Sequence, residues 1–296
     1  CCSSGWRCGD EAHHPSRAGV RSEASFASTV ANGRRCAMRR CGLIAGLGFL
    51  WAPILLLAGY AFSADRIPFQ WGGLSLRWFG ALAANDRLIE AAWLSLRVAA
   101  GAASLATLLG GLAGWALVRG GAFRGRAAFG ALAGAPLVLP EVVTGLSLLL
   151  LFVALAGATG WPAERGATTV LLAHATLGMA YVGVVVQARL AGQAREMEEA
   201  AAALGAAPPI AFLTVTLPLM APALVAGWLL AFTLSLDDVV VASFVSGPAG
   251  TTLPIYLFSR IRVGLTPEIN ALGVVILGVA GLALGAAAWA LRPRRG

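Results

Sequence analysis

Six long apolar segments constrain most strongly what this chain can fold into. A helix of roughly 20 apolar residues crosses the hydrocarbon core of a bilayer, which is about 30 Å thick. Lipid offers no hydrogen-bond partners to the backbone, so segments of this kind are expected to be helical. The predicted spans are residues 43–63, 91–118, 127–157, 167–188, 211–236 and 269–291. They predict an all-α integral membrane protein with six transmembrane helices.

The composition agrees with a membrane protein and excludes several kinds of enzyme. Of the 296 residues, 58% are hydrophobic and 12% are charged, whereas about a quarter of the residues in soluble domains are charged. All 22 basic residues are arginine, and the sequence contains no lysine. The missing lysine excludes a P-loop lysine and a Schiff-base lysine. If the protein depends on ATP, another chain must therefore hydrolyse it.

The charged residues, cysteines and histidines lack the pattern of a nucleic-acid, metal or catalytic site. The net charge is +8, but the arginines lie in short clusters between apolar runs instead of alternating with aromatic residues. All five cysteines lie in the first 41 residues, and neither they nor the adjacent His13 and His14 have zinc-ligand spacing. His174 is the one histidine inside a predicted span, where a packed, hydrogen-bonded residue is more typical than a proton relay. We therefore expect no catalytic residue, no metal site and no nucleic-acid partner.

The first 37 residues differ from the rest of the chain. Residues 1–37 are polar, rich in glycine, serine and arginine, and without a hydrophobic period, which is typical of disordered or misannotated upstream sequence. Met38 is the first methionine, and two arginines and the first apolar span follow it. We therefore expect a membrane domain over residues 38–296.

The arginines also predict the orientation of the spans. From Met38 onward, more arginines lie in the loops on the side of the two termini than in the opposite loops, and they lie close to the span ends. Because positive residues near span ends favour the cytoplasmic side, both termini are predicted to be cytoplasmic. The predicted outer loops are residues 64–90, 158–166 and 237–268.

A short amphipathic helix is predicted in the cytoplasm between spans four and five, over residues 193–206. Gly205 and the pair Pro208-Pro209 are expected to end it, and three glutamates fall in its first turn, where the helix dipole favours anions. A helix this short is not stable alone and needs a docking partner; the alternative is an alanine-rich linker without one. One apolar face is formed by Met197, Ala200, Ala201 and Leu204.

The same segment resembles the EAA signature of the integral-membrane permease subunits of bacterial ABC importers. Glu199-Ala200-Ala201 is followed after three residues by Gly205 and after nine more by Val215-Thr216-Leu217-Pro218. The family usually has isoleucine where Val215 stands. The resemblance implies a type I importer permease fold (MetI-like), whose short helix inserts into a cleft of the ATPase subunit and transmits nucleotide-driven motion. The ATPase-coupling residues that it implies are Glu199, Ala200, Ala201, Leu204, Gly205 and Pro218.

Downstream motifs narrow the resemblance to the second permease of spermidine/putrescine importers. The matching stretches are residues 227–238, 243–248, 251–254 and 266–272. They imply a pore subunit for a small cationic solute, a polyamine such as putrescine or spermidine, in the bacterial inner membrane. The implied partners are a dimer of ABC ATPase subunits, a second homologous permease, a periplasmic solute-binding protein and membrane lipid. The ATPase would use ATP and magnesium, with no cofactor bound by this chain.

Three acidic residues are candidates for the substrate path. Asp237 and Asp238 end the fifth span on its external side, and Glu141 follows Pro140 within the third. A charged group at the bilayer centre costs roughly 2.5–3.5 kcal/mol, so these carboxylates should lie near an interface or in a wet cavity. There they would attract and orient a linear cation. The alternatives are that one aspartate caps a short segment over 239–247 and that Glu141 bonds backbone groups freed by the proline.

Other transport functions remain as alternatives. Permeases for ferric iron or aminoethylphosphonate share the implied architecture. A stand-alone secondary transporter typically has inverted repeats and more ionisable groups within its spans, and neither is evident in the sequence. A membrane enzyme would need a nucleophile with a base, or a set of metal ligands.

Overall fold

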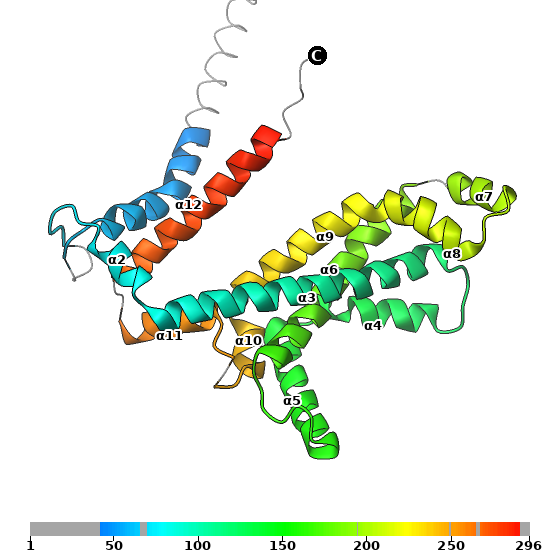
Figure 1. Ribbon diagram of the computed structural model, residues 1–296, viewed down its shortest axis with the longest axis horizontal. Coiled ribbons are helices and arrows are strands. Elements are labelled where there is room, and N and C mark those ends of the chain that lie inside the picture. The colour runs from blue at the N-terminus through cyan, green and yellow to red at the C-terminus, as the bar shows by residue number, and fades with distance from the viewer. Residues whose placement is uncertain (1–41, 66–69, 194, 249, 265–266, 291–296) are drawn as a thin grey trace, which may run out of the picture. The chain divides into compact units, whose positions relative to one another are not determined.

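The chain folds into helices (Figure 1), and a computed structural model describes residues 42–65, 70–193, 195–248, 250–264 and 267–290. Residues 1–37 and the predicted start at Met38 lie outside the described residues. The chain divides into two units, Cys1–Tyr60 and Ala61–Gly296. The described residues of the first unit are 42–60, and all of them are helical. They belong to the helix Gly42–Ala61, whose last residue lies in the second unit.

The second unit consists of long helices with shorter helices between them. Its helices in chain order are α2 (Arg77–Ala83), α3 (Asp86–Arg119), α4 (Arg126–Val138), α5 (Glu141–Thr159), α6 (Ala167–Ala191), α7 (Glu196–Ala203), α8 (Pro208–Ala211), the π-helical turn η1 (Phe212–Thr216), α9 (Leu217–Asp237), α10 (Val240–Val245), α11 (Leu253–Val263) and α12 (Pro267–Ala290).

Five helices of the described chain are long and apolar enough to cross a membrane. They are Gly42–Ala61, α3, α5, α6 and the continuous helix Pro208–Asp237, which α8, η1 and α9 form together. Two shorter apolar helices are α4 and Pro267–Val279, the first part of α12. These lengths confirm an all-α integral membrane fold, and all of the predicted spans except the third lie mainly on one helix each.

The third predicted span, residues 127–157, is not one continuous helix. The structure divides it into α4 and α5, which run in different directions (Figure 1). Pro140 causes the break, because proline disfavours helical backbone in the residue before it. Leu139 is accordingly extended, with φ −76° and ψ 138°. Glu141 therefore begins a helix instead of lying inside one.

Helices α3, α6 and α9 pack closely around one hydrophobic core. Glycines allow the close approach, as small residues commonly do between membrane helices. A Cβ atom added to Gly110 would lie 2.5 Å from the Met179 carbonyl oxygen, and one added to Gly114 would lie 2.8 Å from the Gly183 carbonyl oxygen. The buried residues of this core are Ala103, Ala106, Val182, Val186, Leu190, Met220, Ala223 and Ala231.

The short helix α10 is buried against α5 and α6. Val241 and Val245 belong to one hydrophobic cluster with Phe152 of α5 and Val170 of α6. The hydroxyl of Thr169 donates a hydrogen bond to the carbonyl oxygen of Val245 at 2.8 Å. These contacts hold the turn between α9 and α10 in place.

Candidate functional site

An acidic cavity of about 590 Å³ lies where the break between α4 and α5 meets α6 and the α9–α10 turn. All three predicted substrate-path residues, Glu141, Asp237 and Asp238, line this cavity. The structure thus brings together acids that come from different parts of the sequence. Its other lining residues with polar side-chain atoms are His174, Tyr181 and Ser235.

Glu141 and Asp237 reach the cavity from helix ends. Glu141 is the first residue of α5, where the partial positive charge of the helix N-terminus favours a carboxylate. Asp237 is the last residue of α9. Both residues are exposed, so a solute that enters the cavity can reach their carboxylates.

Asp238 has a different environment from Asp237. Its carboxylate accepts hydrogen bonds from the backbone N–H groups of Val241 and Ala242, each at 3.1 Å, and it thereby caps α10. The Nε2 atom of His174 lies 2.8 Å from the Oδ2 atom of Asp238. Asp238 is therefore the aspartate that caps the following short segment, which was one of the predicted alternatives.

His174 joins three parts of the cavity wall. It lies on α6, and its Nδ1 atom is 2.6 Å from the Oγ atom of Ser235 on α9. On its other side it contacts Asp238 in the α9–α10 turn. The residue is 4% exposed, so it is packed and hydrogen-bonded, as its position inside a span predicts.

The cavity can attract and orient a positively charged solute. Its two exposed carboxylates lie on different helices, and carboxylates bind ammonium groups through short, charge-assisted hydrogen bonds. Such interactions are stronger in a low-dielectric surrounding than in bulk water. Across the part of the chain that the structure describes, no group of three or more His, Cys, Asp or Glu could hold a metal ion.

The short helix predicted between spans four and five is present as α7. It covers Glu196–Ala203 and is therefore shorter than the predicted residues 193–206. Its large apolar side chains face away from the chain: Met197 is 57% exposed and Leu204, just after the helix, is 90% exposed. Glu199 is exposed as well. These side chains are therefore available to another protein.

Gly205 ends α7 in a Schellman motif. The N–H groups of Gly205 and Ala206 donate to the carbonyl oxygens of Ala202 and Ala201, at 2.9 and 3.0 Å. Gly205 has a φ of +84°, in the left-handed region that glycine adopts without a steric cost. The backbone thus explains the glycine of the EAA signature.

Pro218 is the second residue after the π-helical turn η1. The Leu217 N–H donates to the carbonyl oxygen of Phe212, five residues earlier. Proline has no N–H to donate to the carbonyl four residues before it, and hydrogen-bond registers often change at such places in a helix. Pro218 therefore accounts for the irregular start of α9.

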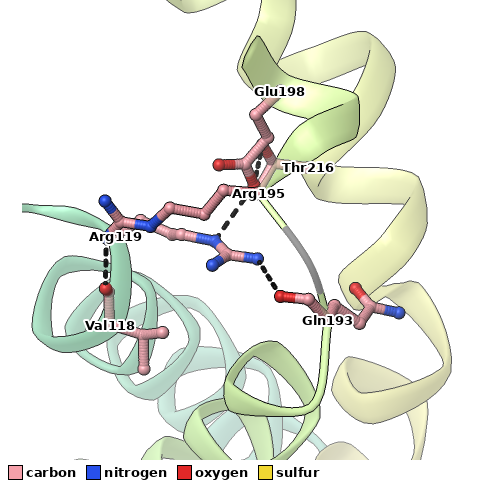
Figure 2. A network of polar contacts seen from close by, with 6 residues as sticks. All are labelled: Val118, Arg119, Gln193, Arg195, Glu198 and Thr216. Carbon is pink, nitrogen blue, oxygen red and sulfur yellow. Dashed lines mark hydrogen bonds and ion pairs between the residues drawn. The ribbon is translucent and has the colours of Figure 1, made fainter. Parts of the chain in front are cut away.

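A polar network that no sequence pattern predicts holds α7 against α3 and η1 (Figure 2). The Nε atom of Arg119, the last residue of α3, lies 3.2 Å from the Oε1 atom of Glu198 on α7. The hydroxyl of Thr216, the last residue of η1, donates to the same oxygen at 3.1 Å. We call these three residues the Glu198 bridge.

Two further hydrogen bonds tie the segment before α7 to the end of α3. Arg119 donates to the carbonyl oxygen of Gln193 at 3.1 Å, and Arg195 donates to the carbonyl oxygen of Val118 at 2.9 Å (Figure 2). The sequence contains two signals for this network: an arginine at the end of one predicted span, and an acidic residue beside the glutamate of the EAA signature. Neither signal indicates the partner, which is distant in the sequence.

Comparison with known proteins identifies close relatives over most of the chain. The putrescine transport system permease protein PotI of Escherichia coli strain K12 is 53% identical over 252 residues, which cover 85% of this chain and 89% of that protein. The spermidine/putrescine transport system permease protein PotC of Haemophilus influenzae is 41% identical over 240 residues, covering 81% of this chain and 91% of that protein. No protein-family model matches the chain.

A solved structure supports the same fold. The match is to a bacterial ABC transporter involved in the import of the acidic polysaccharide alginate. It covers 95% of this chain and 100% of the matched chain, with a TM-score of 0.59 and 14% sequence identity. At this identity the match concerns the fold alone, whereas the relatives above establish the family. The chain is a multi-pass membrane protein that belongs to the family of putrescine and spermidine/putrescine transport system permeases.

Proposed function

We propose that this chain forms half of the pore of a polyamine importer. The observation that carries this proposal is the cavity lined by Glu141, Asp237 and Asp238. A polyamine is a linear cation with ammonium groups at both ends, so carboxylates on separate helices match its charge distribution. The relatives named for putrescine and for spermidine/putrescine transport support the same class of solute.

The remaining parts of the importer are separate subunits. A dimer of ATPase subunits binds ATP and magnesium, while this chain binds no cofactor and has no ATPase site. A second, homologous permease completes the pore, and a periplasmic binding protein delivers the solute. The chain lies in the inner membrane with both termini in the cytoplasm. The absence of lysine from the sequence supports an ATPase site on another chain.

Helix α7 is the part that docks into the ATPase subunit. The exposed apolar side chains of Met197 and Leu204 support a protein partner, and Glu199 lies exposed on the same short helix. Closure of the ATPase dimer on ATP moves α7 and opens the pore toward the loaded binding protein. Hydrolysis then returns the pore to a state open to the cytoplasm.

Uptake by the reconstituted complex tests this function. Liposomes would contain this chain, the second permease and the ATPase, with the binding protein and labelled putrescine on the outer side of the permease. We expect uptake that requires ATP and that excess spermidine inhibits. Inhibition by ferric iron or aminoethylphosphonate instead of polyamines would assign another solute. Uptake without ATP would assign a secondary transporter.

A further inference from the structure

Of the three acids in the first turn of α7, Glu198 is the one directed toward the rest of the chain. Its side chain is 20% exposed and that of its partner Arg119 is 7% exposed, whereas Glu196 and Glu199 are exposed residues. An ion pair shielded in this way is screened by salt less than a surface pair. The pair is therefore a firm attachment of α7, separate from the surface that docks into the ATPase.

One carboxylate oxygen joins three structural elements. The Oε1 atom of Glu198 contacts Arg119 at the end of α3 and Thr216 at the end of η1, at 3.2 and 3.1 Å (Figure 2). A displacement of α7 must therefore either carry the ends of α3 and η1 with it or break both contacts.

One of the elements that the bridge contacts, η1, continues into α9, and α9 extends to the acidic cavity. Directly after Thr216, α9 runs for 21 residues to Asp237, a distance of about 31 Å at 1.5 Å per residue. Asp237 lines the cavity. Packed cores transmit displacement because they have few voids to absorb it, and α9 shares one core with α3 and α6.

We propose that Arg119, Glu198 and Thr216 are positioning residues that transmit movement of α7 to α3 and α9, and that they thereby couple ATP hydrolysis to solute movement. This inference rests on the proposed function, in which α7 docks into the ATPase. Glu199 then lies on the ATPase side of the helix, and the neighbouring Glu198 attaches the helix to the pore.

The test measures how many solute molecules the reconstituted complex takes up for each ATP hydrolysed. We expect Glu198→Gln and Arg119→Gln each to lower this ratio about fivefold or more, the usual size of a coupling between sites. The ATPase should still co-purify with both variants and hydrolyse ATP. The double variant should lower the ratio no further, because either single change already breaks the bridge. Wild-type ratios in both single variants would overturn the inference.

Two further variants keep the test decisive. Thr216→Val removes only the hydroxyl, and we expect it to lower the ratio about twofold, less than the charge variants do, because the ion pair between Arg119 and Glu198 remains. If the charge variants fail to fold, an unchanged ratio in Thr216→Val overturns the inference. Arg124→Gln, at an exposed arginine in the loop after α3, is the matched control and should keep the wild-type ratio. If the ATPase does not bind the wild-type complex, the proposed function itself is contradicted. If the ATPase binds and all variants keep the wild-type ratio, only the coupling role of the Glu198 bridge is contradicted.

Discussion

The two ends of the α3–α6–α9 core carry carboxylates in contrasting environments. At one end, Glu141 and Asp237 are exposed residues that line a cavity of about 590 Å³. At the other end, Glu198 is held by Arg119 and Thr216. An exposed carboxylate can receive a charged solute, whereas a shielded and paired one resists separation because its partner would be left with an uncompensated charge. The same functional group thus suits solute binding at one end and mechanical attachment at the other.

The same contrast between an exposed and a paired carboxylate distinguishes two adjacent residues, Asp237 and Asp238. Asp237 is exposed to the cavity, while Asp238 caps α10 and contacts His174. Although both line the cavity, it is Asp238 that, among the residues that the structure describes, has backbone and side-chain partners that hold the α9–α10 turn. The environment of each carboxylate therefore indicates its role better than its position along the chain does.

The largest expected effect is at the end of the core that carries α7. Deleting residues 199–205 removes the second half of α7 and its Schellman turn, so we expect ATPase binding to be lost altogether. The measurement is co-purification of the ATPase with the tagged permease, and the control is the abundance of the variant in the membrane. Retained association would contradict the docking of α7.

At the cavity end, removing a charge should impair uptake without affecting assembly. We expect Asp237→Asn and Glu141→Gln each to lower uptake about tenfold, the loss of one hydrogen bond to a charged group. Uptake of labelled putrescine into liposomes measures the effect. Glu164→Gln, at an exposed acid outside this cavity, is the control. Unchanged uptake in both cavity variants would remove these residues from the substrate path.

The contrast between Asp237 and Asp238 predicts a difference in stability. We expect Asp238→Ala to lower the free energy of unfolding by about 1–2 kcal/mol, because the variant loses the cap of α10. Asp237→Ala should leave it nearly unchanged, and Asp238→Asn should lie between, since asparagine also caps helices. Thermal unfolding in detergent compares the variants. Equal destabilisation by both alanine changes would mean that the two aspartates do not differ in role.

The smallest expected effect concerns the end of α7. Gly205→Ala places a side chain at a φ of +84°, which costs about 1 kcal/mol and should weaken ATPase binding about fivefold. Gly134→Ala is the matched control, since an added Cβ meets nothing within 4 Å at either position but Gly134 has helical backbone within α4. Titration of the ATPase against the permease in nanodiscs gives both affinities. Equal affinities for the two variants would show that the conformation of Gly205 is unimportant for docking.

Much of this site was predictable because its signals are local. Pro208 and Gly205 mark the end of a short helix, and the spacing from Glu199 to Pro218 matches a family signature. The structure refined these predictions at prolines: Pro140 divides the third span, and Pro218 follows a π-helical turn. A proline is visible in the sequence, but whether a helix bends or stops at it depends on the groups that replace the missing hydrogen bond.

The sequence by itself determined that the chain spans a membrane as helices, because long apolar runs in lipid leave the backbone no other way to satisfy its hydrogen bonds. It also determined which acids were available within or beside those helices. Only the tertiary structure decided which carboxylates meet a partner, as Asp238 does with His174 and Glu198 with Arg119. Those pairs depend on how glycine-lined helices pack, and packing joins residues whose separation along the chain follows no local period.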